Sequence, residues 1–229
     1  MVIAAILAGG RGLRLGRDIP KQFLALGDKP LIKWSVDTFH ENNSIDEIII
    51  VSEKSTINSI RDIFDTGKYP KITAIIEGGS ERVDSSAKAV FFKYYNPDDV
   101  FMIHDAARPF ISDEIITRLI NAVKDHDAAG VYISATDTIG IKRDDLIDSI
   151  PDRKSLVYAQ TPQAFKYHLI REAHENYRLN RTGIITDDVS LVNASGHDVK
   201  IVYGSDRNFK ITTELDYIVA DLLVKNGMI

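Results

Sequence analysis

Short apolar runs recur along this chain, and segments with helical spacing separate them. The clearest run is Ile48-Ile49-Ile50-Val51, whose continuous β-branched side chains are typical of a buried strand in a parallel sheet. Another apolar run covers Val2–Leu7, and the apolar side chains of Leu31–His40 recur at helical spacing. Strands that alternate with helices indicate βαβ units, so we predict an α/β fold with a mostly parallel sheet.

The same two patterns predict the remaining elements. We expect strands at 2–7, 45–51, 72–77, 100–104, 129–134 and 199–202, and helices at 31–40, 56–64, 82–94, 112–126, 162–177, 187–194 and 214–225. The alternation stops between 135 and 158, where two short apolar runs flank the turn Arg143-Asp144-Asp145 and predict a hairpin. Without a linker or repeat, we expect a single domain over 1–229, with an arm at about 135–158 that projects from the sheet.

Composition excludes several classes of protein. The formal net charge of −5 argues against nucleic-acid binding, which usually needs a basic face. Cysteine is absent, which excludes disulfides and thiolate metal sites. We find neither an apolar run long enough to cross a membrane nor a signal-peptide pattern, so we expect a cytoplasmic protein without a membrane partner.

A glycine-rich loop directly follows the first apolar run. It contains Gly9, Gly10 and Gly12, the cations Arg11, Arg14 and Arg17, and then Pro20-Lys21. Such a loop can hold an anion with successive backbone N–H groups, and we expect Arg14 and Lys21 to contact phosphate. A dinucleotide loop needs its third glycine at position 15, which is Leu, and the GK[ST] ending of a phosphate loop is missing. A plain turn remains the alternative.

Two further loops follow expected strands at the edge of the sheet where ligands of open α/β folds bind. Residues 78–86 could hold a base or ribose through backbone groups and Ser85, or could simply cap a helix. Asp105, just past an apolar strand, is a candidate Mg²⁺ ligand, although Arg108 could instead pair with it structurally. We expect His104 to be structural.

Taken together, the motifs of this chain resemble the 2-C-methyl-D-erythritol 4-phosphate cytidylyltransferase family and the related ribitol-5-phosphate cytidylyltransferases. The matching motifs are Gly9-Gly10-x-Gly12-x-Arg14, Pro20-Lys21-Gln22, Gly78-Gly79-x-x-Arg82-x-x-Ser85, His104-Asp105-Ala106-Ala107-Arg108-Pro109, Asp137-Thr138, Ala159-Gln160-Thr161-Pro162-Gln163-Ala164-Phe165, Thr186-Asp187-Asp188 and Asn208-x-Lys210-x-Thr212. Each motif is weak alone, but all of them occur in family order.

The resemblance implies a Rossmann-like nucleotidyltransferase core that transfers CMP from CTP to a polyol phosphate with Mg²⁺ and releases pyrophosphate. It also implies a homodimer in which the arm clasps the partner subunit. The implied catalytic residues are Arg14, Lys21 and Lys210. The implied nucleotide-binding residues are Ala8, Gly9, Gly10, Gly12, Gly79, Ser80, Ser85, Asp105 and Ala106, with Asp105 also at the metal. The implied polyol-phosphate residues are Arg108, Asp137, Thr138, Arg153, Thr161, Thr186 and Asp187.

Two departures concern the acceptor. Leu7-Ala8-Gly9-Gly10 is common in ribitol enzymes, and Val157 stands where the isoprenoid enzymes usually have Trp. Ala107 and Asp152-Arg153 favour the isoprenoid enzymes, so we expect methylerythritol phosphate, with ribitol 5-phosphate as the alternative. From other classes, an inactive nucleotide-binding protein and an NAD-dependent dehydrogenase are further hypotheses. The intact set of charged residues argues against the first, and Leu15 argues against the second.

Overall fold

A seven-stranded sheet forms the centre of the computed structural model, which describes residues 1–10, 19–65, 67–181 and 185–229. The strand order is β11 (Lys200–Tyr203), β7 (Ala128–Ser134), β10 (Val157–Lys166), β6 (Val100–Asp105), β1 (Val2–Leu7), β4 (Glu47–Ser52) and β5 (Ile72–Glu77). β10 runs antiparallel to β6 and β7, whereas the other pairings are parallel. The predicted α/β fold with a mostly parallel sheet is therefore confirmed.

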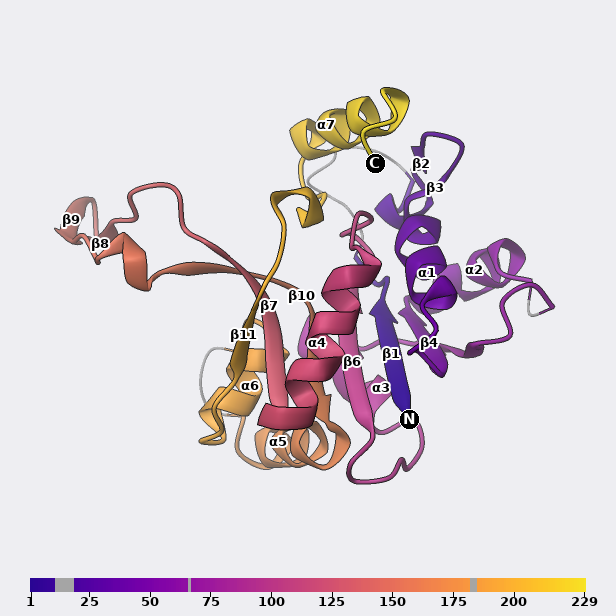
Figure 1. Ribbon diagram of the computed structural model, residues 1–229, viewed down its shortest axis with the longest axis horizontal. Coiled ribbons are helices and arrows are strands. Elements are labelled where there is room, and N and C mark those ends of the chain that lie inside the picture. The colour runs from indigo at the N-terminus through magenta and orange to yellow at the C-terminus, as the bar shows by residue number, and fades with distance from the viewer. Residues whose placement is uncertain (11–18, 66, 182–184) are drawn as a thin grey trace.

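Helices cover both faces of the sheet, because its strands are apolar on both sides (Figure 1). Ala4 and Ile6 of β1 pack with α1 (Leu31–Glu41), α2 (Ile57–Ile63) and α4 (Asp113–His126). Ile3 and Ala5 face the other way, toward α3 (Arg82–Val90), α5 (Tyr167–Asn180) and α6 (Asp188–Ala194). In the described part of the chain, no helix has the length and apolar character that crossing a membrane requires.

A smaller apolar cluster lies beyond the carboxyl ends of the parallel strands. There, α7 (Glu214–Lys225) packs against the short hairpin of β2 (Ala25–Leu26) and β3 (Lys29–Pro30), as Figure 1 shows near the C-terminus. Leu26, Leu31 and Ile211 form its buried centre. Because Ile211 packs in this cluster with Leu26 and Leu31, the segment around residue 210 is held against the hairpin and α1. Four short 3₁₀ helices complete the described elements: η2 (Lys21–Phe23), η3 (Lys54–Thr56), η4 (Arg153–Ser155) and η5 (Asp206–Asn208).

The predicted hairpin is confirmed. β8 (Ile141–Arg143) and β9 (Leu146–Ser149) pair antiparallel at the tip of an arm that projects far from the sheet (Figure 1). Every residue from 140 to 150 is exposed, including Leu146 and Ile147. The arm begins after β7 and returns into β10, which places its base beside the carboxyl end of β7.

The helix predicted over 162–177 is wrong in its first part. Residues up to Lys166 belong to β10, and α5 begins at Tyr167. These residues form a strand because Ala164 and Phe165 pair with both β6 and β7 and are completely buried. No local sequence pattern reveals such pairing with distant strands. The helix predicted over 82–94 also ends early, at Val90.

Candidate functional site

The four parallel strands β1, β4, β5 and β6 end at one edge of the sheet. Leu7 lies opposite both Asp105 and Val51, and Ser52 lies opposite Glu77. From β1 the chain continues on one side to β4 and then β5, whereas β6 returns on the other side. Ligands of open α/β sheets bind outside such a switch point, so this edge is the expected site.

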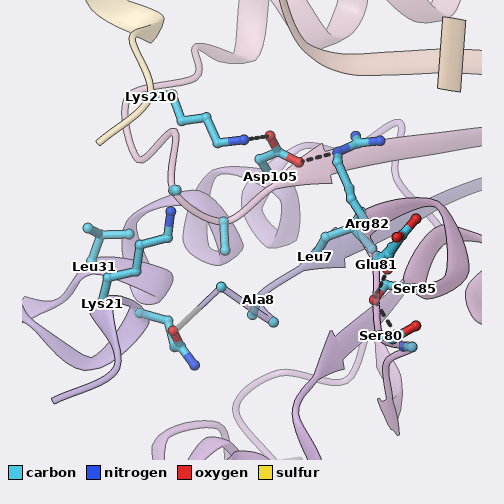
Figure 2. A pocket seen from close by; sticks show the side chains of 16 residues that line it. Leu7, Ala8, Lys21, Leu31, Ser80, Glu81, Arg82, Ser85, Asp105 and Lys210 are labelled. Atoms are coloured by element: carbon cyan, nitrogen blue, oxygen red, sulfur yellow. Dashed lines mark hydrogen bonds and ion pairs between the residues drawn. The ribbon is translucent and has the colours of Figure 1, made fainter. Parts of the chain in front are cut away.

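A pocket opens at this switch point, and loops from three strands line it. The loop after β1 contributes Ala8, Gly9 and Gly10, the loop after β5 contributes Gly79 and Ser80 with Ser85 of α3, and β6 contributes Asp105 with Ala106. Lys21, Gln22, Glu81, Arg82 and Lys210 complete the polar lining. The structure thus brings together the predicted nucleotide-binding residues and two of the three predicted catalytic cations (Figure 2). Gly12 and Arg14, which were also predicted here, lie outside the described residues.

Asp105 is the central charge of the pocket. Its Oδ2 accepts a hydrogen bond from Lys210 Nζ at 2.6 Å, and its Oδ1 accepts one from Arg82 Nε at 3.1 Å. Figure 2 shows the two cations reaching the carboxylate from opposite sides. Burial alone would raise the pKa of Asp105, but the charges of Arg82 and Lys210 outweigh it and hold the pKa far below its usual range. Asp105 is therefore ionised at neutral pH.

Arg82 begins α3 and replaces Arg108 as the arginine partner of Asp105. Its Nη1 donates to Asp188 at 2.6 Å, so one guanidinium joins two carboxylates. A capping box formed by Glu81 and Asp84 fixes the start of the helix. Burial alone would lower the pKa of Arg82, but Asp188 and Asp105 outweigh it and raise the pKa.

Two lysines approach the pocket from different segments. Lys21 opens η2 directly after Pro20, and its Nζ donates to the carbonyl of Ile211 at 3.4 Å. The N–H of Ile211 in turn bonds to the carbonyl of Ala107 at 2.8 Å, which ties the segment that carries Lys210 to the loop after β6. A backbone carbonyl therefore holds the Lys21 ammonium near the segment that carries Lys210, and the Lys210 ammonium itself is bonded to Asp105.

A buried polar network supports the end of β6. The Thr161 hydroxyl accepts the N–H of Asp105 at 3.0 Å and lies 3.2 Å from Nδ1 of His104. His104 is completely buried, and this burial lowers its pKa to about 4, so the ring is neutral at pH 7. Asn208 donates to the carbonyl of Thr161 at 2.9 Å. These contacts support the structural role predicted for His104, and they show that Thr161 is already engaged with the backbone of Asp105.

None of the residues predicted to hold the polyol phosphate lines this pocket. Arg108 donates from Nη1 and Nη2 to the carbonyls of Asn208 and Ala159 at 2.8 and 3.2 Å. Asp187 caps α6 and accepts Gln163 Nε2 at 2.6 Å, and Thr186 beside it is exposed. Three more of these residues, Asp137, Thr138 and Arg153, lie exposed in the arm.

The sequence motifs contain Arg82, Gln163 and Asp188, for which we predicted no role. The structure shows that Gln163 Oε1 accepts the N–H groups of Asp188 and Val189, both at 3.1 Å. It also shows that Asp188 is almost completely buried against Arg82 and His174. Two features of the sequence could have pointed to this ion pair. Arg82 is the arginine of the GGxxR motif, and Asp188 is the second acid of Thr186-Asp187-Asp188.

The donor set fits a cation that is shared with a substrate. No cluster of three or more histidines and acids that could hold a metal occurs in the described ranges. Mg²⁺, however, usually keeps several waters and takes one or two carboxylates plus substrate phosphates. Asp105 is ionised and lines the pocket, and a carboxylate has about four lone-pair sites, of which two are used here. It could therefore ligate a metal that a triphosphate also holds.

Known proteins resemble this chain over nearly its whole length. The family described as 2-C-methyl-D-erythritol 4-phosphate cytidylyltransferase (IspD) matches residues 2–226. An enzyme of that name from Clostridium tetani is 38% identical, covering 97% of this chain and 89% of the relative. A crystal structure of a 4-diphosphocytidyl-2C-methyl-D-erythritol synthase from Anaerococcus prevotii is 31% identical, with a TM-score of 0.85 and coverage of 98% and 96%. An IspD structure from Francisella tularensis is 26% identical, with a TM-score of 0.82 and coverage of 96% and 98%.

Proposed function

This chain belongs to the 2-C-methyl-D-erythritol 4-phosphate cytidylyltransferase family, and we propose that it transfers CMP from CTP to 2-C-methyl-D-erythritol 4-phosphate. The products are the CDP-polyol and pyrophosphate, a step of isoprenoid biosynthesis by the non-mevalonate route. The observation that carries the proposal is one pocket, lined by two glycine loops, that contains Lys21 together with Lys210 bonded to an ionised Asp105. We further propose that residues 1–229 act as a single cytidylyltransferase domain.

The chemistry requires charge neutralisation more than proton transfer. The nucleophile is an oxygen of a phosphate monoester, which is already anionic near neutral pH, so no strong general base is needed. The difficulty lies in bringing this anion onto a triphosphate. Catalysis then depends on positioning and on fixed positive charge, which are the two things that a rigid cationic pocket supplies.

Lys21 and Lys210 supply the fixed positive charge, together with Arg14 from the glycine-rich loop. We propose that they bind the triphosphate and stabilise the charge that builds up on the α-phosphoryl group. Asp105 would hold Mg²⁺, which when bound screens the phosphates and polarises the α-phosphoryl oxygens. Lys210 donates to Asp105 at 2.6 Å and lines the pocket, so rotation of its side chain would turn the ammonium from that carboxylate to a phosphate bound there.

The loop after β5 is proposed to hold the nucleoside. The N–H of Gly79 donates to the Ser85 hydroxyl at 3.0 Å, and that hydroxyl donates to the carbonyl of Glu81 at 3.1 Å. Ser85 therefore shapes the loop, while Ser80 and the backbone of Gly79 line the pocket. Small side chains and open backbone groups suit a flat base that must be recognised at short range.

The acceptor is proposed to bind across two subunits. Arg108, Thr161, Thr186 and Asp187 come from the body of the chain, whereas Asp137, Thr138 and Arg153 come from the arm. The arm carries exposed apolar residues at its tip, and a homodimer in which each arm covers the partner would bury them. Its phosphate-binding residues would then reach the partner's pocket rather than their own.

Parallel assays of pyrophosphate release test this function. With CTP and Mg²⁺, we expect release with 2-C-methyl-D-erythritol 4-phosphate and little with ribitol 5-phosphate. Release with ribitol 5-phosphate alone would show that the acceptor is wrong. CTP binding without release from either acceptor would identify an inactive nucleotide-binding protein, and absence of CTP binding would overturn the proposal entirely.

A further inference from the structure

Four charged side chains of alternating sign form a line that starts at the pocket and ends inside the protein. Lys210 donates to Asp105 at 2.6 Å, Arg82 joins Asp105 at 3.1 Å, and the same Arg82 joins Asp188 at 2.6 Å. Lys210, Asp105 and Arg82 line the pocket, and Asp188 does not. The inner end of the line therefore lies outside the machinery described above.

Asp188 is rigidly held in its place. Only 1% of its side chain is exposed, and its N–H donates to Gln163 Oε1 at 3.1 Å. On the side away from Arg82, its Oδ1 lies 3.5 Å from Nε2 of His174, which is equally buried. Its place at the first position of α6, directly after the N-cap Asp187, fixes the backbone as well.

Arg82 transmits this rigidity to the pocket. A guanidinium is planar and presents its donors in a fixed fork, so two carboxylates bound to different nitrogens determine its orientation. Asp188 binds Nη1 and leaves Nε for Asp105. Without the inner acid, the guanidinium could rotate or give both donor edges to Asp105, and the carboxylate would move or lose its free lone pairs.

The connection also joins two halves of the site. Arg82 stands at the start of α3, directly after the loop proposed to hold the nucleoside, and Asp188 follows Thr186-Asp187 on the proposed acceptor side. They lie 106 residues apart in the chain. An ion pair between them fixes the distance between these two segments, and the same Arg82 also binds Asp105.

We infer that Asp188 is a positioning residue that acts through Arg82 to fix the Asp105 carboxylate at the pocket. The inference rests on the proposed function, because it gives a purpose to a carboxylate that binds Mg²⁺ together with CTP. The competing explanation is that Asp188 and Arg82 form a buried ion pair that only stabilises the fold.

A double-mutant cycle separates the two explanations. Asp188→Asn keeps the size of the side chain and one acceptor oxygen, and Arg82→Lys keeps the charge but cannot span two carboxylates. Each single variant and the double variant are compared by kcat, by the KM for CTP, and by calorimetry of CTP binding with and without Mg²⁺. Glu47→Gln is the matched control, because Glu47 is a buried carboxylate paired with Lys93 at 2.7 Å and does not line the pocket.

We expect Asp188→Asn to lower kcat by about tenfold to a hundredfold, the range typical of residues that orient a metal ligand. The gain in CTP affinity that Mg²⁺ provides should shrink in the same variant, while CTP binding without Mg²⁺ changes by less than about threefold. In the double variant the two losses should not add, because both residues act along one path. Glu47→Gln should lower the melting temperature without either change.

The inference is overturned if Asp188→Asn lowers the melting temperature but leaves both kcat and the Mg²⁺ effect on CTP binding at the wild-type values. Additive losses in the double variant would also overturn it, since Asp188 would then act independently of Arg82. Calorimetry of CTP binding does not need turnover. The positioning role of Asp188 can therefore fail while the proposed cytidylyl transfer stands. Wild-type protein that does not bind CTP would overturn the proposed function and this inference together.

Discussion

At the scale of single residues, the site depends on a carboxylate that is buried and still ionised. Burial opposes the charge of Asp105, and two cations in direct contact more than compensate. Lys210 is the more exposed member of the pair, with a third of its side chain accessible, whereas Arg82 is also bound by a second acid. Removing each cation should therefore have a different consequence.

Lys210→Ala should reduce turnover far more than stability. Removing one fixed charge that faces a transition state costs about a hundredfold to a thousandfold in kcat. Asp105 keeps its bond to Arg82, and Lys210 is partly exposed, so the free energy of unfolding should fall by only about 1 kcal/mol. Steady-state kinetics and urea unfolding measure the two effects. Lys225→Ala, which removes an exposed lysine paired with Asp221 on α7, is the control, and full turnover of Lys210→Ala would refute the assigned role.

The lowered pKa of Asp188 predicts that the folded protein loses stability in acid. Burial alone would raise the pKa of Asp188, but Arg82 and His174 outweigh it and lower the pKa to about 2. In the unfolded chain the pKa of an aspartate is about 4, so the unfolded state binds the proton first as the pH falls. The stabilisation is therefore complete above about pH 4 and is lost between about pH 4 and pH 2, and it amounts to about 2 kcal/mol.

Unfolding curves of wild type and Asp188→Asn between pH 2 and pH 6 test this linkage. The variant cannot titrate at this position, so its free energy of unfolding should fall less steeply in the acid window. The stability difference between the two proteins should be largest above pH 4 and should narrow toward pH 2. Parallel curves across the whole range would show that the ion pair with Arg82 does not lower the pKa of Asp188.

At the scale of elements, the sequence pattern predicted the helices and strands whose hydrophobic periodicity is local. The strand over 72–77 and the helix over 214–225 have the predicted bounds, and all three loops that end at the pocket were found. β10 was missed because Gln160, Thr161 and Gln163 are polar yet buried, and their partners are Ser205, Asp105 and Asp187. The pairing of Arg82 with Asp188 was missed for the same reason, since no local pattern reveals partners so far apart.

Gly79 gives a prediction for the loop between β5 and α3. A Cβ at this position would overlap Asp84 Cβ and lie 3.0 Å from its carbonyl carbon, so the loop could not keep its present distance from the helix. We expect Gly79→Ala to weaken CTP binding about tenfold and to cost about 1–3 kcal/mol of stability through overpacking. Calorimetry and urea unfolding measure both.

Gly67→Ala is the matched control, because its added Cβ would make only an ordinary contact of 3.4 Å with Asp65. If Gly79→Ala bound CTP as tightly as wild type while losing stability, the loop would not be part of the nucleoside pocket. If Gly79→Ala lost neither CTP affinity nor stability, the loop would be able to move away from α3 without a cost in free energy.

At the scale of the whole molecule, the arm exposes apolar side chains that the other described residues of the same chain do not cover. Leu146 and Ile147 are 69% and 67% exposed, and β8 and β9 pair with no other strand among the described residues. A two-stranded hairpin is marginally stable in water, so these apolar side chains favour a partner surface. A second copy of the chain, related by a two-fold axis, would cover both arms in the same way.

The strongest consequence of such a dimer is that two damaged subunits can restore one intact site. In a dimer of Arg153→Ala with Lys21→Ala, the pocket of the first subunit keeps Lys21 and receives Arg153 from the arm of the second. The other pocket lacks both. Random mixing makes half of the dimers mixed, each with one intact site of two, so co-expressed subunits should reach about a quarter of wild-type turnover.

Each variant alone should be nearly inactive, because every pocket of its homodimer lacks one of the two cations. The mixed preparation is obtained by co-expression with two affinity tags, and its oligomeric state is measured by sedimentation. Recovery of turnover requires that Arg153 act in the partner's pocket. A dimer that forms but shows no recovery would place Arg153 in its own subunit's site or outside catalysis. A monomer with full wild-type turnover would show that the arm does not act on a partner subunit.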